Sequence, residues 1–363
     1  MTALTKIHPW NKVVWDNLIA KSESGRKPHA LLFCGAYGLG KRALAEAYSR
    51  HVLLDNEQQD SFDAGNLFEA GTHPDMHVLM SEASVDAQPD TIFAKFAVRY
   101  LGERGTRKPK KIISVDQVRS LRQSIVSTTA GHSSRVVVLP DASTMNTNAA
   151  NSLLKNLEEP PGETVFLLLS DKPESLPATI RSRCTPIYFR CPSSEITQNW
   201  LQESTQSGAN GTESGRGENI DNVEVLLAFA GGAPLLALAL HQTGDRERHS
   251  NLLRQLCDVL MGKTAPLCAA KIWHEDAPEL IVQLTQQLFS DLIRCRVSEQ
   301  VEPAFYKAQK QWLHRQGNRL NSKKLFSMWQ KTLKTAQLMA GSSDKLLIIE
   351  SLAFDLANAG KTN

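Results

Sequence analysis

A glycine-rich turn between an apolar run and a helix-like segment constrains the fold of this chain more than any other feature. Residues 35–42 read Gly-Ala-Tyr-Gly-Leu-Gly-Lys-Arg and match the pattern G-x-x-x-x-G-K-[ST] of a P-loop except at the last position. In a P-loop, backbone N–H groups wrap the phosphates, the lysine reaches the terminal phosphates, and a Ser or Thr hydroxyl binds Mg²⁺. Arg42 stands at the hydroxyl position, and a guanidinium has no acceptor for a metal ion. The candidate phosphate contacts are Gly35, Gly38, Gly40 and Lys41.

The segments on both sides of the turn favour a real P-loop. Residues 29–34 form an apolar run typical of a buried parallel strand, and residues 43–48 favour the start of a helix. Strand, glycine turn and helix is the order that the motif requires. A glycine turn without a ligand has the same pattern, so the sequence leaves present-day nucleotide binding open.

Length and composition set the outer limits. A chain of 363 residues with 41% hydrophobic residues predicts two or three domains with proper cores, and a net charge of +3 identifies no partner. The six cysteines are scattered without a C-x-x-C pair, which favours reduced thiols over disulfides or a zinc site. Residues 1–12 lack a signal peptide's apolar core, and no apolar stretch is long enough for a membrane span. We expect a soluble cytoplasmic protein.

Further strands alternate with helical stretches through the first half of the chain. Apolar runs at 77–80, 135–139, 164–169 and 186–189 are typical of strands. A helix with one apolar face is predicted from 115 to 125, and Ser114 and Gln117 form a capping box at its start. This alternation predicts an α/β domain with a parallel sheet covered on both faces over residues 1–190.

Two stretches look like loops. Residues 81–112 end in a basic cluster that either contacts nucleic-acid phosphates or is a solvated surface; its members are Arg104, Arg107, Lys108, Lys110 and Lys111. Residues 204–222 are rich in Gly, Ser and Asn and predict a flexible loop.

After residue 245 the pattern is helical. Leucines recur every fourth residue from Leu280 to Leu292, and residues 325–339 and 346–356 show similar helical patterns. These faces form either an ordinary helical core or an oligomerisation surface, and the sequence does not separate the two.

The second element of a P-loop ATPase is incomplete. Such an enzyme needs an apolar strand that ends in an Asp for Mg²⁺, usually followed by a carboxylate that activates water. The strand at 135–139 leads to Asp141, but Ala142 occupies the position of the activating carboxylate. With Arg42, two separate sites lack the groups that hydrolysis needs, so we predict that this chain is not an ATPase.

Two longer motifs carry a family resemblance. Residues 151–161 read Asn-Ser-Leu-Leu-Lys-Asn-Leu-Glu-Glu-Pro-Pro, and Ser-Arg-Cys follows at 182–184. Both resemble the clamp-loader subunits of bacterial DNA polymerase III, and the blocks at 25–32 and 70–75 resemble the delta prime branch of that family. The resemblance is strong over residues 8–192 apart from 81–112, which looks like an insertion. Beyond residue 192 it is weak and depends mainly on residues 230–234 and the helical C-terminus.

The resemblance implies a fold and a domain organisation. We expect a RecA-like AAA+ P-loop domain at 1–190, a small helical lid at 191–245, and an all-α collar at 246–363 that joins five subunits into an open ring. The partners implied are the other clamp-loader subunits, delta and tau/gamma, and, through the assembled loader, the sliding clamp and primer-template DNA. No membrane is implied.

The resemblance also implies one catalytic role. In this family the arginine of Ser-Arg-Cys reaches the ATP on a neighbouring subunit, which assigns an arginine finger in trans to Arg183. A planar, permanently charged guanidinium suits the stabilisation of phosphoryl-transfer charge. The alternative is an arginine paired with a surface carboxylate, and Arg181 is a nearby residue that is easily confused with the finger.

Other family features are missing. By register Leu235 stands where active loader ATPases have a lid arginine, and Ser170-Asp171 replaces the threonine pair expected after the fourth strand. Many delta prime subunits carry a four-cysteine zinc module, but residues 51–69 contain no cysteine. We therefore predict no structural zinc and no required cofactor, with ATP bound passively at most.

The function expected from these observations is a non-hydrolysing clamp-loader subunit of the DNA-directed DNA polymerase III holoenzyme. It supplies Arg183 to a neighbouring ATPase and helps load the sliding clamp during replication. The alternative is an active AAA+ motor ATPase of the tau/gamma type that tolerates Arg42. A third hypothesis, an unrelated P-loop kinase or adaptor, has less support from the motifs.

Overall fold

A computed structural model of the chain describes residues 7–24, 28–54, 61–103, 106–127, 134–207, 223–243, 245–298, 303, 306, 309–339, 341 and 344–361. The chain divides into two compact units, Met1–Cys191 and Pro192–Asn363. Each unit is described by itself below.

The first unit is built on a parallel sheet of five strands in the order β2-β3-β4-β1-β5. The strands are β1 (Ala30–Cys34), β2 (Met76–Val78), β3 (Arg135–Leu139), β4 (Thr164–Ser170) and β5 (Thr185–Tyr188). All seven residues of β4 are buried, as expected for a central strand with both faces covered. The predicted α/β fold with a parallel sheet is confirmed, and every predicted strand is present within one or two residues.

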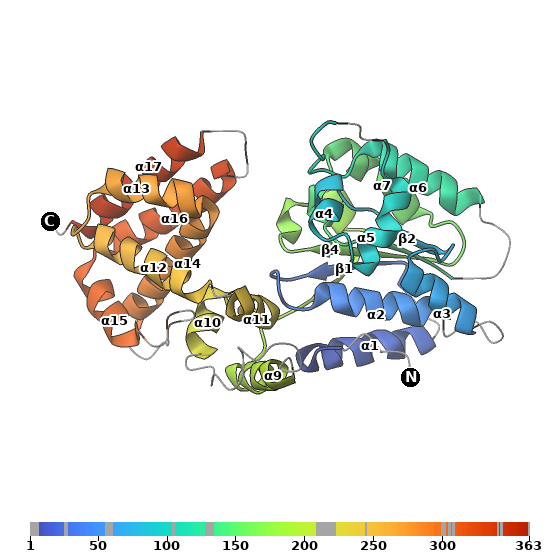
Figure 1. Cartoon of the computed structure of the whole chain (residues 1–363), viewed down its shortest axis with the longest axis horizontal. Coiled ribbons are helices and arrows are strands. Elements are labelled where there is room, and N and C mark those ends of the chain that lie inside the picture. The colour runs from blue at the N-terminus through green and yellow to red at the C-terminus, as the bar shows by residue number, and fades with distance from the viewer. Residues whose placement is uncertain are drawn as a thin grey trace. The chain divides into compact units, whose positions relative to one another are not determined.

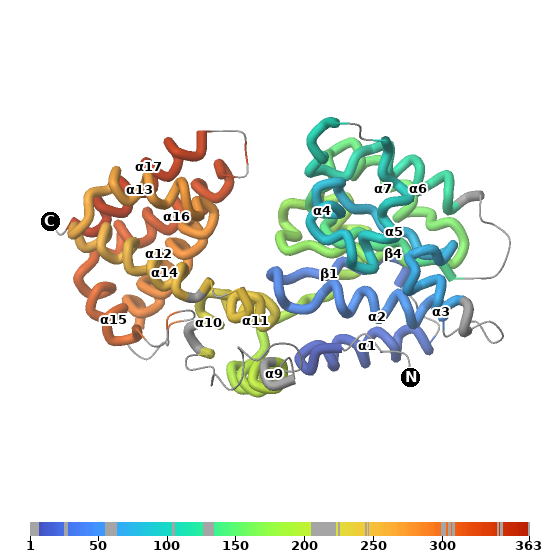
Figure 2. Tube along the Cα trace, in the orientation of Figure 1, coloured from blue at the N-terminus to red at the C-terminus, as the bar shows by residue number. Residues whose placement is uncertain are grey.

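Helices cover both faces of this sheet (Figure 1). On one face, apolar residues of α6 (Val115–Ser127) and α7 (Thr147–Glu158) join alternate residues of the strands, such as Val137, Phe166 and Leu168, in one core. The other face is covered by α2 (Lys41–Leu54), outside which lies α1 (Lys12–Glu23) (Figure 2). There Trp15 of α1 meets His51 of α2 with ring centroids 5.9 Å apart.

Shorter elements connect these layers. They are the 3₁₀ turns Pro9–Asn11, Ala142–Thr144 and Pro173–Ser175 and the helices α3 (Ser61–Ala70) and α8 (Ala178–Arg181). The predicted capping box at the start of α6 is confirmed. The Ser114 N–H donates to Gln117 Oε1 at 2.9 Å, and the Gln117 N–H donates to Ser114 Oγ at 3.4 Å.

The prediction of a loop over residues 81–112 is wrong for residues 82–100, whereas the described residues of 101–112 contain no helix or strand. The segment contains α4 (Glu82–Ala87), α5 (Ile92–Ala97) and the 3₁₀ turn Val98–Tyr100. Phe93, Phe96 and Tyr100 are buried in the first unit. Helices of six residues are too short to show a periodic apolar face, and they are stabilised by the tertiary contacts of these aromatic residues.

The described part of the second unit is helical. Its first helices, α9 (Ser194–Ser207), α10 (Val223–Phe229) and α11 (Pro234–Thr243), pack on one another. The remaining helices also pack together; they are α12 (Arg246–Leu260), α13 (Pro266–Asp276), α14 (Pro278–Val297), α15 (Lys310–Arg319), α16 (Ser322–Met339) and α17 (Lys345–Gly360). The division into a lid at 191–245 and a collar at 246–363 stays a prediction.

The sequence patterns in this unit have mixed outcomes. The predicted helices at 280–292, 325–339 and 346–356 are present as α14, α16 and α17. The predicted loop at 204–222 is wrong for residues 204–207, which belong to α9, and residues 208–222 lie outside the described part. Among the described residues, no helix is both long enough and apolar enough to cross a membrane.

Candidate functional site

The carboxyl edge of the sheet brings three of the charged residues together. The P-loop with Lys41 follows β1, Asp141 follows β3, and Asp171 follows β4, and these three strands are neighbours in the sheet. Parallel strands place the residues that follow them at a single edge, which is where ligands of such sheets bind. The structure therefore places the predicted residues Lys41 and Asp141 beside Asp171, which sequence reasoning noticed only as a replaced threonine.

The glycine turn has the backbone of a P-loop and is held from outside. All three motif glycines have positive φ angles. At Gly40, with φ +84°, an added Cβ would lie 2.7 Å from His8 Cδ2 and 2.8 Å from Asn11 Nδ2. The carbonyl oxygen of Leu39 accepts hydrogen bonds from Trp10 Nε1 at 3.0 Å and Asn11 Nδ2 at 2.9 Å. The segment before α1 therefore fixes the end of the loop where α2 begins.

The ammonium group of Lys41 is turned back into its own loop. Its Nζ donates to the carbonyl oxygens of Gly35 at 2.6 Å and Ala36 at 2.8 Å, and to Asp171 Oδ1 at 2.5 Å. The Lys41 side chain is 6% exposed and that of Asp171 is 47% exposed. An ammonium group has three donors, so these contacts use all of them.

Two positions of the motif, 42 and 142, lack the groups that bind the metal and activate water in a P-loop ATPase. Arg42 donates to Gln88 Oε1 at 2.5 Å, so the residue at the hydroxyl position is bonded to the segment that follows α4. Burial raises the pKa of Asp141 above its ordinary value, and the neighbouring Asp171 carboxylate raises it further. Ala142 is fully buried and its side chain has no polar group, so position 142 itself supplies no base. Whether this edge supports hydrolysis stays a prediction.

A cavity of about 360 Å³ opens beside this cluster, at the carboxyl ends of β1 and β5. It is lined by Cys34, Gly35, Asp171, Pro173, Tyr188, Phe189 and Arg190. Gly35 is required in its wall, because an added Cβ would lie 2.6 Å from the carbonyl oxygen of Phe189. The volume is at the lower end of the range of small-molecule sites.

Arg183 lies at the opposite end of the sheet. It precedes β5 by two residues, and the first residue of β5, Thr185, pairs with Leu31 near the start of β1. The P-loop starts at Gly35, four residues further along, or about 13 Å at roughly 3.3 Å per residue. Arg183 therefore lies near the amino ends of the strands, whereas the P-loop of the same chain lies at their carboxyl ends.

The Arg183 guanidinium is partly exposed and has two partners. Nη1 donates to the carbonyl oxygen of Thr179 at 3.0 Å, and Nη2 pairs with Glu158 at the end of α7. The Arg183 side chain is 36% exposed and that of Glu158 is 47% exposed. This surface pair is the alternative that the sequence left open for Arg183, and in the chain by itself the arginine makes it. Its role in trans stays a prediction.

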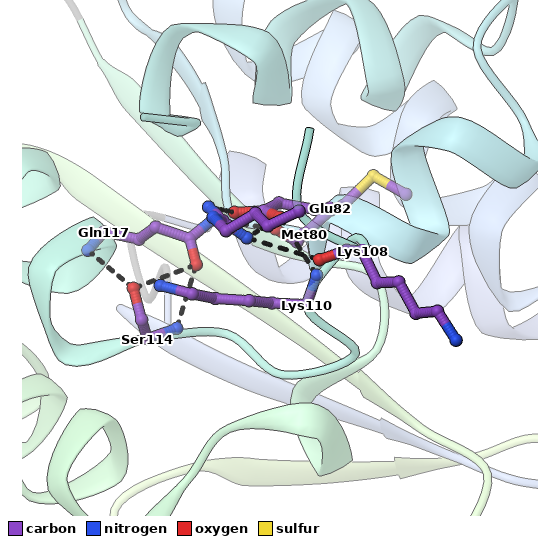
Figure 3. A network of polar contacts seen from close by, with 7 residues as sticks. Met80, Glu82, Lys108, Lys110, Ser114 and Gln117 are labelled. Carbon is purple, nitrogen blue, oxygen red and sulfur yellow. Dashed lines mark hydrogen bonds and ion pairs between the residues drawn. The ribbon is translucent and has the colours of Figure 1, made fainter. Parts of the chain in front are cut away.

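A buried carboxylate organises the basic segment before α6 (Figure 3). Glu82, at the start of α4, accepts from Arg107 Nη1 and Nη2 at 2.7 and 2.6 Å and from the Lys110 N–H at 2.9 Å. These hydrogen bonds, that from Arg107 above all, lower the pKa of Glu82 to about 2. Gln117 Nε2, on α6, donates to the carbonyl oxygen of Met80 at 2.8 Å and so bonds α6 to the residues that follow β2.

The three lysines of this segment have exposed side chains, and the backbone that carries them is bonded to Glu82 at Lys110. Lys108, Lys110 and Lys111 are exposed, and Lys108 extends away from the network in Figure 3. Arg107 is engaged by Glu82, and Arg104 lies outside the described residues. Of the predicted basic cluster, the three lysines are therefore the described cations that do not pair with Glu82, and their contact with nucleic-acid phosphates stays a prediction.

The second unit exposes large apolar side chains on α16 and on α17. On α16, Phe326, Trp329 and Leu333 follow a helical repeat and are 36–48% exposed. On α17, Leu347 and Phe354 are 65% and 47% exposed. These two helices pack on each other.

Comparison with known proteins decides the family. The family model described as DNA polymerase III, delta subunit, matches residues 10–193. A relative from Escherichia coli strain K12, named DNA polymerase III subunit delta', is 32% identical over 301 residues, which are 81% of this chain and 78% of the relative. The chain belongs to this delta prime family.

A second relative agrees with that membership, and a solved structure is similar over most of the chain. The delta prime subunit of Pseudomonas aeruginosa is 29% identical over 361 residues, which are 98% of each chain. Among solved structures, a DNA polymerase III gamma subunit-related protein from Thermotoga maritima is similar over 95% of this chain and 99% of its own, with 14% identity and a TM-score of 0.40. Membership in the delta prime family confirms the resemblance drawn from the sequence motifs and removes the hypothesis of an unrelated kinase or adaptor.

The absence of a structural zinc stays a prediction. Among the residues that the structure describes, no three His, Cys, Asp or Glu side chains are grouped to hold a metal ion. Residues 55–60, within the stretch where other delta prime subunits carry zinc ligands, lie outside that part.

Proposed function

We propose that this delta prime family member is a non-hydrolysing subunit of a bacterial clamp loader. It places Arg183 in the ATP site of a neighbouring subunit and helps load the sliding clamp on primer-template DNA. The observation that carries this proposal is the position of Arg183 near the amino ends of the strands, whereas its own P-loop lies at their carboxyl ends. An arginine there is too far away to serve the nucleotide site of its own chain.

The state of the P-loop supports the absence of hydrolysis. Mg²⁺ needs oxygen ligands, and Arg42 offers only donors and is bonded to Gln88. Ala142 provides no base, and Lys41 is bonded within its own loop. No nucleotide of its own is therefore required. This is also the argument against the alternative, an active motor ATPase of the tau/gamma type.

The contacts of Arg183 are compatible with a role in trans. The pair with Glu158 joins two partly exposed side chains, and such a pair contributes at most about 1 kcal/mol. A phosphate group with several negative charges is a stronger partner for a planar guanidinium. Assembly with a neighbour can therefore redirect Arg183 at low cost, whereas a buried ion pair would hold it.

Assembly with other clamp-loader subunits, delta and tau/gamma, is supported by the second unit. The exposed surface of α16 and α17 carries aromatic and leucine side chains, the residue types that gather at protein interfaces. We assign this surface to the contact with neighbouring subunits in the ring. The sliding clamp and DNA are reached through the assembled loader.

The test is reconstitution with candidate loader subunits, with complex formation and DNA-stimulated ATPase measured on the same samples. The Arg183→Ala variant is expected to assemble normally and to reduce hydrolysis at the neighbouring site by about 10³-fold or more. The assay is sharpest in a loader in which only that neighbour's P-loop is intact.

Arg181→Ala is the matched control, because Arg181 is exposed, lies two residues away and is expected to leave hydrolysis unchanged. Undiminished activity with Arg183→Ala would remove the finger assignment. ATP turnover by the isolated chain that disappears with Lys41→Ala would instead favour the motor ATPase.

A further inference from the structure

The contacts of Lys41 differ from those that a working P-loop needs. In a working loop the lysine reaches the terminal phosphates of the nucleotide. Here a carboxylate oxygen of Asp171 lies 2.5 Å from Nζ, and the two other donors are taken by the carbonyl oxygens of Gly35 and Ala36. An anionic oxygen of the protein is thus bonded to the ammonium group that binds phosphate oxygen in a working loop.

Topology explains why Asp171 reaches this place. β4 lies beside β1 in the sheet, and Cys34, the last residue of β1, is paired with Ser170, the last residue of β4. The residues that follow the two strands, Gly35 and Asp171, therefore start side by side. Ser170 is itself bonded to Ser143 Oγ at 2.7 Å, and its Oγ accepts from the Lys172 N–H at 3.1 Å. Asp171 is thus held between two fixed residues.

Charge at this edge acts against a polyphosphate. Asp171 neutralises Lys41, and Asp141 is close enough for the Asp171 charge to raise its pKa. An incoming phosphate must displace one carboxylate from the only buried lysine of the loop and lie beside another. Like charges that close repel strongly at a protein surface.

We propose that Asp171 is the residue that excludes nucleoside triphosphates from this P-loop, by holding its carboxylate on Lys41 where a terminal phosphate would bind. A neutral side chain at position 171 opens a latent nucleotide site. The backbone for it is present, because the glycine turn has its P-loop conformation and a cavity of about 360 Å³ borders Asp171. This inference rests on the proposed function. It adds to that function a reason why the nucleotide site of this chain is closed.

A second explanation for an empty site is Arg42 with its bond to Gln88. The two explanations make different predictions. If Asp171 closes the site, Asp171→Thr opens it while Arg42 is still present. If Arg42 closes it, only Arg42→Thr does so. Hydrolysis is expected from neither variant, because Ala142 still offers no base.

The experiment measures ATP and ADP binding by the full chain with titration calorimetry, with and without Mg²⁺. Asp171→Thr and Asp171→Asn are compared with Asp116→Asn, a control that removes a carboxylate from an exposed ion pair with Arg119. The wild-type chain and the control are expected to bind too weakly to measure at millimolar ATP. Both Asp171 variants are expected to bind at least about tenfold more tightly, since the repulsion removed exceeds the free energy of a factor of ten.

A double variant links the gain to Lys41. Adding Lys41→Met to Asp171→Thr is expected to abolish the new binding, and a thermal shift with ATP gives a second readout that also reports folding. Micromolar binding by the wild-type chain, or no gain in either Asp171 variant, overturns the proposal. Opening by Arg42→Thr alone also overturns it. Failure of the proposed function would appear elsewhere, in the Arg183→Ala loader assay.

Discussion

Two cations in the first unit, Lys41 of the P-loop motif and Arg183, our candidate for a neighbour's ATP site, have opposite surroundings. Lys41 is 6% exposed and all three of its donors are bonded within the chain. Arg183 is 36% exposed and has two described partners for its five donors, one of them a half-exposed carboxylate. The first is a structural ion pair, and the second keeps donors available to another molecule.

The difference shows how a chain can retain the glycine turn of a P-loop while the lysine of that motif is bonded within the chain. A P-loop lysine becomes unavailable once a carboxylate is placed beside it, without any change in the glycine turn. Arg183, in contrast, has described partners, the Thr179 carbonyl oxygen and Glu158, that are both exposed, so they hold the guanidinium less firmly. We therefore expect substitutions at the two sites to act on different measurements.

The largest effect is expected from Arg183→Lys. Lysine keeps the charge but loses the planar fork that binds two phosphate oxygens at once. Hydrolysis at the neighbouring site of the reconstituted loader is expected to fall by about 10³-fold, nearly as far as with alanine. Single-turnover ATP hydrolysis in a loader with one intact neighbouring site measures this. Activity close to wild type would show that charge alone is needed and would weaken the contrast with Lys41.

The basic segment adds a third kind of cation to the comparison. Its lysine side chains are exposed, and its backbone is hydrogen-bonded to Glu82. If Lys108, Lys110 and Lys111 contact DNA phosphates, replacing all three with alanine lowers the slope of log affinity against log salt by about one per lysine. Loader–DNA binding measured from low to physiological salt tests this.

A matched variant with Lys12, Lys271 and Lys334 replaced by alanine has the same change in net charge at other exposed positions. An unchanged slope in the first variant, or an equal change in the second, would favour a solvated surface for the basic segment. Loss of a loader subunit with an unchanged slope would point to a protein partner.

Lys41→Met is expected to affect stability and not catalysis. It removes charged hydrogen bonds of a buried ammonium group, but Asp171 is half exposed and regains water, so the free energy of unfolding falls by about 1–2 kcal/mol. Loader ATPase is expected to stay at the wild-type level. Urea unfolding and the loader assay on the same preparation check both parts. A large loss of ATPase at normal assembly would mean that this P-loop works after all.

The smallest effect is expected from Glu158→Gln. The variant removes the carboxylate that pairs with Arg183 at the surface, and such a pair is worth at most about 1 kcal/mol. Unfolding free energy and loader ATPase are both expected to change little. A strong fall in ATPase with normal stability would show that Glu158 holds Arg183 in its working orientation, so that the pair is more than a resting contact.

The fold of the first unit followed from sequence where the patterns were long and regular. The apolar runs at 135–139 and 164–169 predicted buried strands, and the pair Ser114 and Gln117 predicted the start of α6. The loop prediction failed over residues 82–100 because the helices there have six residues each, and their stability comes from burying Phe93 and Phe96 against other elements.

The candidate site divides in the same way. Residue type alone showed that Arg42 and Ala142 lack the chemistry for Mg²⁺ and water, because a missing acceptor or base is a property of the side chain. Which partner each remaining charge has was beyond the sequence. Asp171 is 130 residues from Lys41 along the chain and lies beside it only because β4 is the neighbour of β1 in the sheet.

By itself, the sequence determined the class of the fold, the family and the list of missing catalytic groups, since motifs and periodicity are local properties of the chain. Tertiary structure alone decided that Lys41 is bonded to Asp171, that Arg42 is bonded to Gln88, and that Arg183 lies at the opposite edge with Glu158. The physical reason is that hydrogen bonds and burial depend on which segments the sheet brings together, and strand order is not written in any one segment.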